Sequence, residues 1–468
     1  MSFREESDSL GVVRIPKNRL WGAQTQRSLE NFRIGGLSER MPIELIHTLA
    51  LVKKCAARAN QELSLLDGEK ADAIIQSAEE VRQGQWDDHF PLVVWQTGSG
   101  TQTNMNVNEV IANRAIQILG GRFGDKSVHP NDDVNKCQSS NDVFPAAMNI
   151  VSVDQVSGIL LKKLKSLEKS LNVKAKEFEK IIKVGRTHLM DATPLSLGQE
   201  FSGYAGQMAS HQDRLKGCLV RLYSLGLGGT AVGTGLNAHP DFAKRAIAFI
   251  AEETGYPFLP VQNLFTSSSA HDDLVELSGF LKTLACGLMK LGNDIRLMAS
   301  GPRAGFNEIF IPANEPGSSI MPGKVNPTQS EALTMVCAEV IGCDAAVSIG
   351  GASGHFELNV FKPLIIFNIL RSIQLLASAS ESFQKNCVDG IKANEQQLKQ
   401  NLDRSLMLVT ALNPHIGYDK AAQIAKAAYQ NGSTLKEEAL RLGYVTAEEF
   451  DRIIRPRDML GPKNKITG

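Results

Sequence analysis

Apolar residues recur every three or four positions along residues 151–182, the spacing that places them on one face of an α-helix. Lysine and glutamate occupy much of the opposite face, as contact with water favours. We predict one helix of about nine turns over this segment, a length more typical of helical bundles than of compact domains. Its apolar positions are Val153, Val156, Leu160, Leu164, Leu167, Leu171, Ala175, Phe178 and Ile182.

Four more segments have the same helical spacing, and glycines and prolines separate them. Five long helices without a repeat of fixed period predict a mainly α fold with a long central helical bundle. Such a bundle exposes long apolar faces, and association of subunits is the simplest way to cover them. The four segments are about 197–225, 265–299, 328–349 and 357–386.

The pattern changes on either side of this bundle. The first part of the chain combines helical spacing at 41–60 and 67–83 with polar stretches of low helical content at 97–108 and 121–142. After residue 388 the pattern breaks into shorter amphipathic pieces. We therefore predict three domains, namely a mixed N-terminal domain 1–140, the bundle 141–390 and a small helical C-terminal domain 391–468.

Composition excludes several classes of function. The 468 residues carry 50 Lys and Arg against 50 Asp and Glu, so no basic field favours a nucleic acid or an anionic membrane surface. We find no run of about 18 apolar residues and predict no membrane span. The seven cysteines stand singly, and the N-terminal segment has the features of neither a signal peptide nor a transit peptide. We therefore expect reduced thiols and a cytoplasmic protein.

Polar loops flank the predicted long helices. The first, TGSGTQTNMNVNE at 97–109, offers hydroxyls, amides and N–H groups that suit a carboxylate or phosphate, or it is a solvated turn. In the second, 129–142, Ser139 and its neighbours either cap a helix or bind an anion. Its His129 has no second histidine at ligand spacing, so we expect no metal there.

The third polar loop, GRTHLMDATP at 185–194, contains His188 between Arg186 and Asp191. A single histidine is more often structural than functional. This residue type nevertheless exchanges a proton between about pH 5 and 8, and the surroundings of this one are polar. His188 is therefore a candidate general acid or base.

The fourth polar loop, PGSSIMPGKVNP at 316–327, is similar to a phosphate-binding P-loop but does not match it. Its glycines are one residue too far apart, and Val325 stands where Ser or Thr would bind magnesium. Ser318 lies at one end of this flexible segment, and Lys324 and Asn326 lie at the other. An ordinary turn needs neither the lysine nor the asparagine, so we expect an anion site.

Together the four loops supply hydroxyls, amides, one histidine and one lysine, without a metal, dinucleotide or activated-cysteine signature. That set suits a small polyanionic substrate and proton transfer beside a carboxylate, as in a lyase or an isomerase. A helical scaffold without catalytic activity is the alternative from another class, and a scaffold would not need these polar side chains.

Four blocks of this chain resemble the fumarase/aspartase superfamily: TGSGTQTNMNVNE, HPNDDVNKCQSSNDVFPAA, GRTHLMDATPLSLGQEF and GSSIMPGKVNP. Within it the chain looks most like class II fumarases, which are independent of iron. His188 and the run Pro327-Thr328-Gln329 separate it from aspartate ammonia-lyases, the alternative. The resemblance implies reversible hydration of fumarate to (S)-malate, a step of the tricarboxylic acid cycle, without a cofactor. It also implies a three-domain fold and a homotetramer whose active sites each take loops from three subunits.

The resemblance further implies roles for single residues. Ser318 matches the base that removes a proton beside a carboxylate. Lys324 and Asn326, with loop N–H groups, would stabilise the aci-carboxylate that forms. His188, oriented by Glu331, would exchange the hydroxyl proton; in an alternative scheme a His188-activated water is the base. The implied substrate-binding residues are Ser99, Gly100, Thr101, Ser139, Ser140, Asn141, Thr187, Ser319, Lys324, Val325 and Asn326. The implied residues of a second anion site are Lys126, His129, Pro130, Asn131 and Asp132.

Overall fold

The computed structural model describes residues 2–462, so the outermost residues of the first and last predicted domains lie outside the described part. The chain divides into two compact units, each assembled from three separate stretches of sequence. The boundaries of the three predicted domains stay a prediction. The first unit comprises 1–162, 211–285 and 336–377, and the second comprises 163–210, 286–335 and 378–468.

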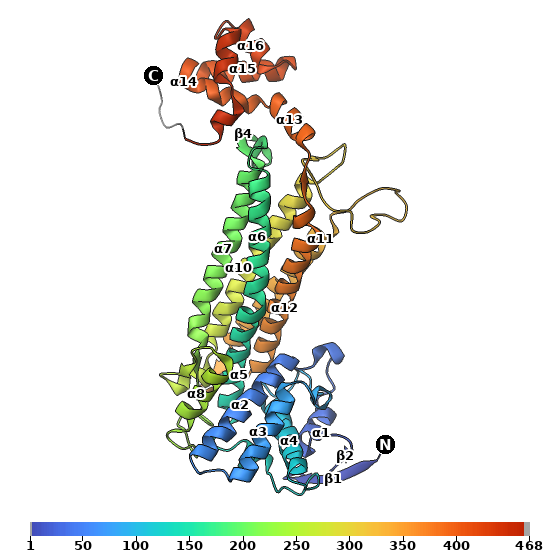
Figure 1. Cartoon of the computed structure of the whole chain (residues 1–468), viewed down its shortest axis with the longest axis vertical. Helices are drawn as coiled ribbons and strands as arrows, with labels where there is room; N and C mark the ends of the chain where they lie inside the picture. The colour runs from blue at the N-terminus through green and yellow to red at the C-terminus, as the bar shows by residue number, and fades with distance from the viewer. Residues whose placement is uncertain (1, 463–468) are drawn as a thin grey trace. The chain divides into compact units, whose positions relative to one another are not determined.

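The first unit begins with an antiparallel hairpin of β1 (Phe3–Asp8) and β2 (Gly11–Pro16), followed by helix α1 (Ala23–Asn31). Helix α2 (Ile43–Glu62) packs against α3 (Gly68–Arg82), and Figure 1 shows the two side by side in blue. Their inner faces are closed by aliphatic side chains without measurable exposure, such as Leu49 and Ile74. The two helices expected at 41–60 and 67–83 are therefore confirmed.

Helix α4 (Thr101–Ile118) corrects one expectation, because it occupies most of the segment 97–108 that we expected to be low in helix. Asparagine and threonine disfavour helices in water, since their side chains compete for backbone hydrogen bonds. Here the core supplies the partners: Asn106 donates to the His89 carbonyl at 3.1 Å and Asn113 donates to the Leu20 carbonyl at 2.7 Å. Tertiary hydrogen bonds thus override local propensity.

The long helix predicted from 151 runs through α5 (Ser140–Gln155), five residues of π-helix and α6 (Leu161–Glu177). Of its predicted apolar positions, those from Val153 to Leu171 are buried, and so is Phe178, whereas Ala175 is half-buried. The prediction is wrong at its end, because Ile182 begins strand β3 (Ile182–Thr187) instead of a last helical turn. The β-branched residues of this strand favour an extended backbone.

The other predicted long helices are also present. They are α7 (Leu197–Leu222), α10 (Asp272–Met298), α11 (Thr328–Gly351) and α12 (Lys362–Asn386), each with residues in both units. Two start later than expected: a short α9 (Leu264–Ser269) ends before α10, and a turn and a short strand at 358–359 precede α12. Side-chain hydrogen bonds join neighbours, as from Tyr204 of α7 to Asp294 of α10 at 3.0 Å. The mainly α fold with a central long-helix bundle is confirmed.

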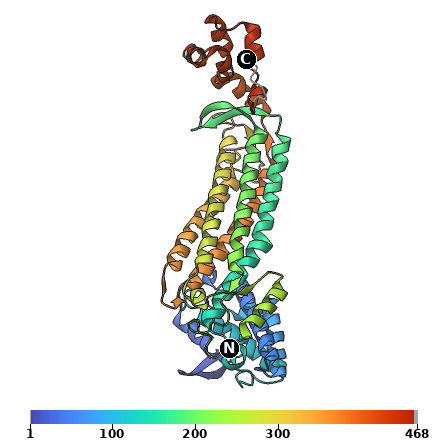
Figure 2. The ribbon, with the colours of Figure 1, turned by 90° about the vertical axis from the view of Figure 1, so that its left-hand side faces the viewer.

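All sheets among the described residues are two-stranded. The largest of the second unit pairs β3 with β4 (Met190–Ser196), and Figure 2 shows it as one elongated green ribbon. Helix α8 (Phe242–Thr254) belongs to the first unit. The remaining pairs are β5 (Ser224–Leu225) with β6 (Leu259–Pro260), β7 (Ile309–Phe310) with β10 (Lys392–Ala393), and β8 (Gly354–His355) with β9 (Leu358–Asn359).

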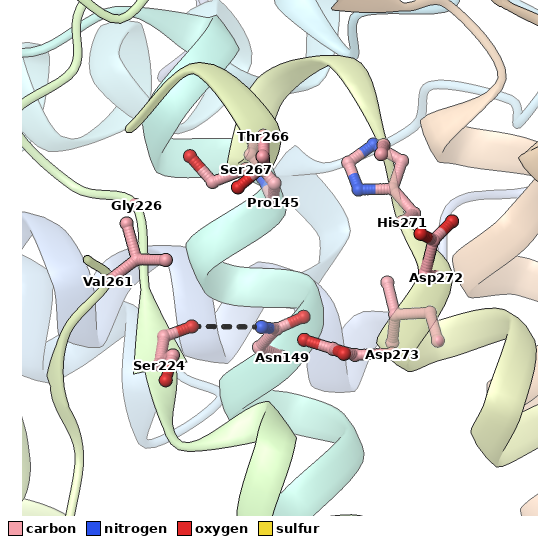
Figure 3. A pocket seen from close by; sticks show the side chains of 12 residues that line it. Pro145, Asn149, Ser224, Gly226, Val261, Thr266, Ser267, His271, Asp272 and Asp273 are labelled. Atoms are coloured by element: carbon pink, nitrogen blue, oxygen red, sulfur yellow. Dashed lines mark hydrogen bonds between the residues drawn. The ribbon is translucent and has the colours of Figure 1, made fainter. Parts of the chain in front are cut away.

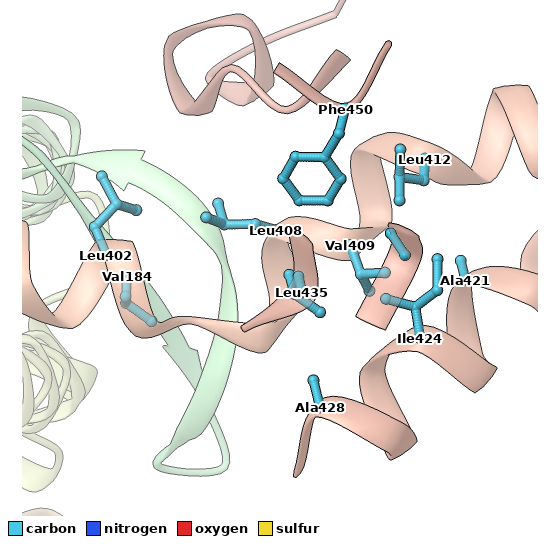
Figure 4. Close-up of a cluster of buried hydrophobic side chains, with 11 residues drawn as sticks. Val184, Leu402, Leu408, Val409, Leu412, Ala421, Ile424, Ala428, Leu435 and Phe450 are labelled. Carbon is cyan, nitrogen blue, oxygen red and sulfur yellow. The ribbon is translucent and has the colours of Figure 1, made fainter. Parts of the chain in front are cut away.

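The C-terminal helices of the second unit have their own core, drawn in Figure 4. Leu412, Ile424 and Phe450 meet there, and Val184 of the β3–β4 hairpin joins them, so these helices hold the base of the hairpin. Capping boxes at Thr434 and Thr446 start the last two α-helices. The helices are α13 (Glu395–Arg404), α14 (Asn413–Ile416), α15 (Tyr418–Asn431), α16 (Leu435–Arg441) and α17 (Ala447–Ile453).

Three helical segments are long and apolar enough to cross a membrane, although none contains the unbroken apolar run on which the prediction of no span depended. By length and composition alone, 140–177, 328–351 and 362–390 reach that range, because Ala, Gly and Ser dilute their charges without forming an unbroken apolar run. In the structure 67%, 33% and 56% of their most apolar windows are buried. Segment 328–351, helix α11, is thus the one whose apolar surface is least covered by its own chain.

Candidate functional site

The first two polar loops come together at the N-termini of α4 and α5. Asn104 in the first turn of α4 donates its side-chain N–H to Ser140 Oγ at 3.0 Å. Beside it, Ser99 Oγ and Thr101 Oγ1 lie 2.8 Å apart. Two helix N-termini with hydroxyls around them form a surface suited to negative charge.

Two glycines fix the shape of the first loop. A Cβ atom on Gly98 would lie 1.3 Å from the carbonyl oxygen of Val360, so the backbone there passes too closely for any side chain. Gly100 has φ of +77°, and its Cβ would lie 2.4 Å from the Phe144 ring. The turn into α4 is thus fixed by the core of the unit.

The second loop ends in a helix cap. Ser139 is the N-cap of α5 and forms a capping box with Asp142, whose carboxylate also accepts the backbone N–H groups of Gly228 and Thr230. Burial raises the pKa of Asp142 to about 6, against the effect of these N–H donors. The next residue along from Ser140, Asn141, donates its side-chain N–H to the Ala231 carbonyl at 2.8 Å. The expected cap is present, and it fixes Ser140 as the first residue of α5.

Four of the five residues expected at a second anion site line one cavity of about 330 Å³ in the first unit. His129 Nδ1 accepts the backbone N–H groups of Asn131 and Asp132 at 3.3 and 3.1 Å. Lys126 stands on a backbone with φ of +59°. Carboxylates also line the cavity, including the buried Glu109, whose pKa burial raises. The lining is therefore of mixed charge.

The third polar loop is the tip of the β3–β4 hairpin. His188 and Leu189 both have positive φ, 58° and 62°, and form the two-residue turn between the strands. Thr187 and His188 are exposed, and no hydrogen bond to the imidazole occurs among residues 2–462. Glu331 is exposed in the first turn of α11 and has no described contact with His188. A single chain thus does not pair the two residues.

A buried ion network anchors this hairpin. Glu308, without exposed surface, lies 2.6 Å from Arg186 and 2.8 Å from Lys183, which also pairs with Glu200 at 2.7 Å. Burial alone would raise the pKa of Glu308, but Arg186 and Lys183 outweigh it and lower that pKa. Arg186 directly precedes Thr187, so the network sets the direction in which the tip projects.

Hydrogen bonds within the fourth polar loop fix its shape. Asn326 donates its side-chain N–H to the Gly317 carbonyl, and a Cβ on Gly317 would lie 1.9 Å from the Lys324 carbonyl oxygen. Ser318 Oγ accepts the backbone N–H groups of Ile320 and Met321 at 3.2 and 3.0 Å. Ser319, Lys324 and Val325 are exposed. The side chain of Asn326, expected to orient an anion, here donates a hydrogen bond to the backbone of its own loop.

Some features were missed by the sequence reasoning. The lysines Lys53 and Lys362 are fully buried, although nothing in their apolar surroundings along the chain distinguishes them from surface lysines. A cavity of about 150 Å³ near the start of α10 contains His271 and Asn149 but none of the expected site residues (Figure 3). Within residues 2–462 no group of three or more His, Cys, Asp or Glu side chains is placed to hold a metal ion.

Known proteins share this architecture. A sequence profile described as "Lyase" matches residues 11–342, and one described as "Fumarase C C-terminus" matches 408–461. A class II fumarate hydratase from Thermosynechococcus vestitus is 61% identical over 461 residues, which are 98% of either chain. A mitochondrial fumarate hydratase from Rattus norvegicus is 58% identical over 463 residues, which are 99% of this chain and 91% of that relative. The crystal structure of a class II fumarase from Schistosoma mansoni matches with a TM-score of 0.97 and 44% identity, covering 99% of this chain and 100% of that one.

Proposed function

This chain belongs to the lyase family, in its class II fumarase branch, and from that premise we propose that it catalyses the reversible hydration of fumarate to (S)-malate. The observation that carries the proposal is the near-full-length identity to relatives named fumarate hydratase. The polar groups described above fit a substrate with two carboxylates, because they offer donors at several points and few competing acceptors.

Binding of the carboxylates falls to the N-termini of α4 and α5. Ser99, Thr101 and Ser140 present hydroxyls there, and the positive ends of two helices favour an anion. Side-chain hydrogen bonds between these loops support a preorganised site. Binding of substrate then costs little conformational entropy.

Removal of the carbon proton falls to Ser318. A serine hydroxyl is a weak base unless its oxyanion is stabilised. The two backbone N–H groups on Ser318 Oγ are donors of that kind and favour the alkoxide. Lys324 on the same loop would stabilise the aci-carboxylate, whose second negative charge forms as the proton leaves. The exposure of this loop is consistent with a segment that closes over substrate.

Exchange of the hydroxyl proton falls to His188, either directly or through a water. The exposed hairpin tip leaves both ring nitrogens able to reach a substrate. Glu331 would orient the imidazole from another copy of the chain, since no contact between the two residues is described within one chain. The alternative, in which a His188-activated water removes the carbon proton, uses the same residues, and Ser318→Ala separates the two schemes.

We propose a homotetramer as the working form, with each site built from three subunits. Helix α11 supports this, because small and apolar residues form an exposed stripe along it: Ala332, Met335, Ala338, Gly342, Ala345 and Ile349. Glycines in the middle of helices cost stability, about 1 kcal/mol each relative to alanine. A Cβ atom on Gly206, Gly217 or Gly342 would nevertheless meet no atom of its own chain within 4 Å, as expected where a second helix approaches closely.

The location and the second anion site remain proposals of the same kind. We propose a cytoplasmic location, although relatives include proteins named mitochondrial. We also propose that the cavity around Lys126 and His129 accepts a second anion. The positive charge of the lysine would attract this anion and offset the repulsion from the nearby carboxylates.

The proposed reaction is tested by the ultraviolet absorbance of fumarate. Purified protein incubated with (S)-malate should produce fumarate, whereas L-aspartate should produce none. Fumarate from aspartate alone would make the chain an aspartate ammonia-lyase. Absence of product from both, in a folded tetramer, would favour a scaffold without catalytic activity.

A further inference from the structure

Two lysines of the first unit are buried without measurable exposure, Lys53 in α2 and Lys362 at the start of α12. Neither has an ion-pair partner within 4 Å among the described residues. An ammonium group without a paired charge is costly to bury, so chains rarely retain one without a use for it. Both lysines instead donate to neutral oxygens.

Lys53 lies behind Ser140, and two side chains, Asn135 and Asn104, connect them. Its Nζ donates to Asn135 Oδ1 at 2.8 Å and to Gln138 Oε1 at 3.0 Å. Asn135 Oδ1 also accepts the side-chain N–H of Asn104 at 3.3 Å, and Asn104 donates to Ser140 Oγ. The Asn135 oxygen thus accepts from both the ammonium group and Asn104, and this shared acceptor connects Lys53 to a hydroxyl of the proposed carboxylate site.

Lys362 lies behind Asn141 and the turn that carries Ser99. Its Nζ donates to the Ser268 carbonyl at 3.1 Å and to the Asn359 carbonyl at 2.5 Å. The Ser268 hydroxyl donates to the Asn141 carbonyl at 3.3 Å, and the Lys362 backbone N–H donates to the Gly98 carbonyl at 3.0 Å. The second lysine thus supports the two loops from the other side.

We propose that Lys53 and Lys362 are positioning residues of the dicarboxylate site, which hold its two loops and supply the positive potential that a dianion requires. The inference rests on the proposed function, because that function supplies the dianion. Neither lysine touches substrate. Each acts through Asn104, Ser140, Asn141 or the turn at Gly98.

The protonation of the two lysines adds a property that can be measured. Burial lowers the pKa of each to about 7, and the carboxylate of Asp142 opposes this at Lys53. The titratable group facing Lys362 is His271, which is buried. Burial and the lysine lower its pKa to about 3, so the imidazole is neutral at pH 7. A dianion bound nearby would raise the pKa of both lysines. Dianion binding at pH 8 should therefore take up protons from the solvent.

The simpler alternative is that the lysines only satisfy buried carbonyl oxygens. Replacement by methionine, which is of similar length and neutral, would then lower stability without distinguishing one ligand from another. The positioning role predicts that the loss of binding affinity grows with the charge of the ligand, because a cation attracts a dianion about twice as strongly as a monoanion.

The experiment measures binding of succinate and butyrate to the whole protein by calorimetry, for Lys53→Met and Lys362→Met. We expect succinate binding to weaken about tenfold in each variant, and butyrate binding to weaken about threefold or less. The fumarate KM should rise with kcat changed less, and Lys53→Arg should restore most of the affinity. Lys174→Met is the control at a buried lysine outside the site. Lys174 donates to the Ile391 carbonyl and contacts none of the expected site residues, although it also pairs with Glu177 at 2.9 Å.

An equal loss of affinity for both ligands, or no loss, would overturn the inference. The proposed function would still stand if the wild-type protein hydrates fumarate. If the methionine variants do not fold, a measurement on the wild-type protein tests the inference instead. Succinate binding at pH 8 in two buffers of different ionisation enthalpy should show proton uptake, and its absence would equally overturn the inference. A wild-type protein without activity on fumarate would remove the proposed function first, and this inference with it.

Discussion

The two halves of the proposed active site are built in opposite ways. At the N-termini of α4 and α5, loops are cross-linked by side chains, fixed by glycines that touch the core and supported by buried lysines. The loop 317–327 forms hydrogen bonds mostly within itself, and it leaves Ser318 half-buried and Lys324 exposed; His188, at the hairpin tip, is also exposed. In the proposed mechanism, carboxylate binding is thus prepared by each chain's own core, whereas the proton-transferring groups would meet the substrate only on loop closure and with a neighbouring copy.

This difference follows from what each half must do. A binding surface gains affinity from rigidity, because ordering costs are met on folding. A base that must meet the substrate only when water is excluded gains from mobility, which glycines provide and prolines limit.

The largest effect is expected from breaking the assembly. Ala345→Glu places a charge in the exposed apolar stripe of α11 and should prevent close helix contact between copies. Light scattering should show smaller particles, and fumarate hydration should fall below detection while circular dichroism keeps its helical signal. Ala248→Glu, the same change at an exposed alanine of α8, is the control. An active monomer would mean that one chain completes its own site.

Ser318→Ala should lower kcat by about 10⁴-fold with the tetramer intact, because it removes the oxygen that the Ile320 and Met321 N–H groups stabilise. Succinate binding should change little, since the carboxylate half is untouched. Stopped-flow or steady-state absorbance of fumarate measures the loss. Ser318→Thr keeps the hydroxyl and should retain part of the activity. A fully active alanine variant would assign the carbon proton to a His188-activated water.

His188→Asn should lower kcat by about 10²-fold and flatten one limb of the pH–rate profile. Asparagine tolerates the positive φ of this turn residue, so the hairpin should keep its shape. The pH dependence of kcat/KM from about pH 5 to 9 is the measurement. An unchanged bell-shaped profile in the variant would mean that another group titrates, and the hairpin tip would then serve binding only.

The sequence predicted the long helices well, because apolar residues at three- and four-residue spacing mark a face that only a helix can bury. The prediction failed where tertiary contacts decide the secondary structure. The asparagines of α4 form a helix only because buried carbonyls accept their side-chain N–H groups. Ile182 continues the apolar spacing but begins a strand. The polar residues of the loops were found, but not their contacts, since the N–H groups on Ser318 and the lysines behind Ser140 depend on backbone geometry.

The smallest effect on activity, and a clear one on stability, is expected from Glu308→Gln at the base of the hairpin. Removing one carboxylate leaves Lys183 buried with only Glu200 as partner and should cost about 3 kcal/mol at pH 7. Thermal unfolding measures this. Glu200→Gln, at a partly exposed position of the same network, should cost less.

The pH dependence of this loss follows from the lowered pKa of Glu308. A depressed folded-state pKa contributes stability that is complete above the unfolded value, about 4.3, and is lost as pH falls through the folded value. Wild type and Glu308→Gln should therefore differ most at neutral pH and converge in acid, below about pH 4. A difference that is independent of pH would show that packing, and not the charge on Glu308, holds the hairpin that carries His188. The exposed tip would then be set by the hydrophobic base around Val184 alone.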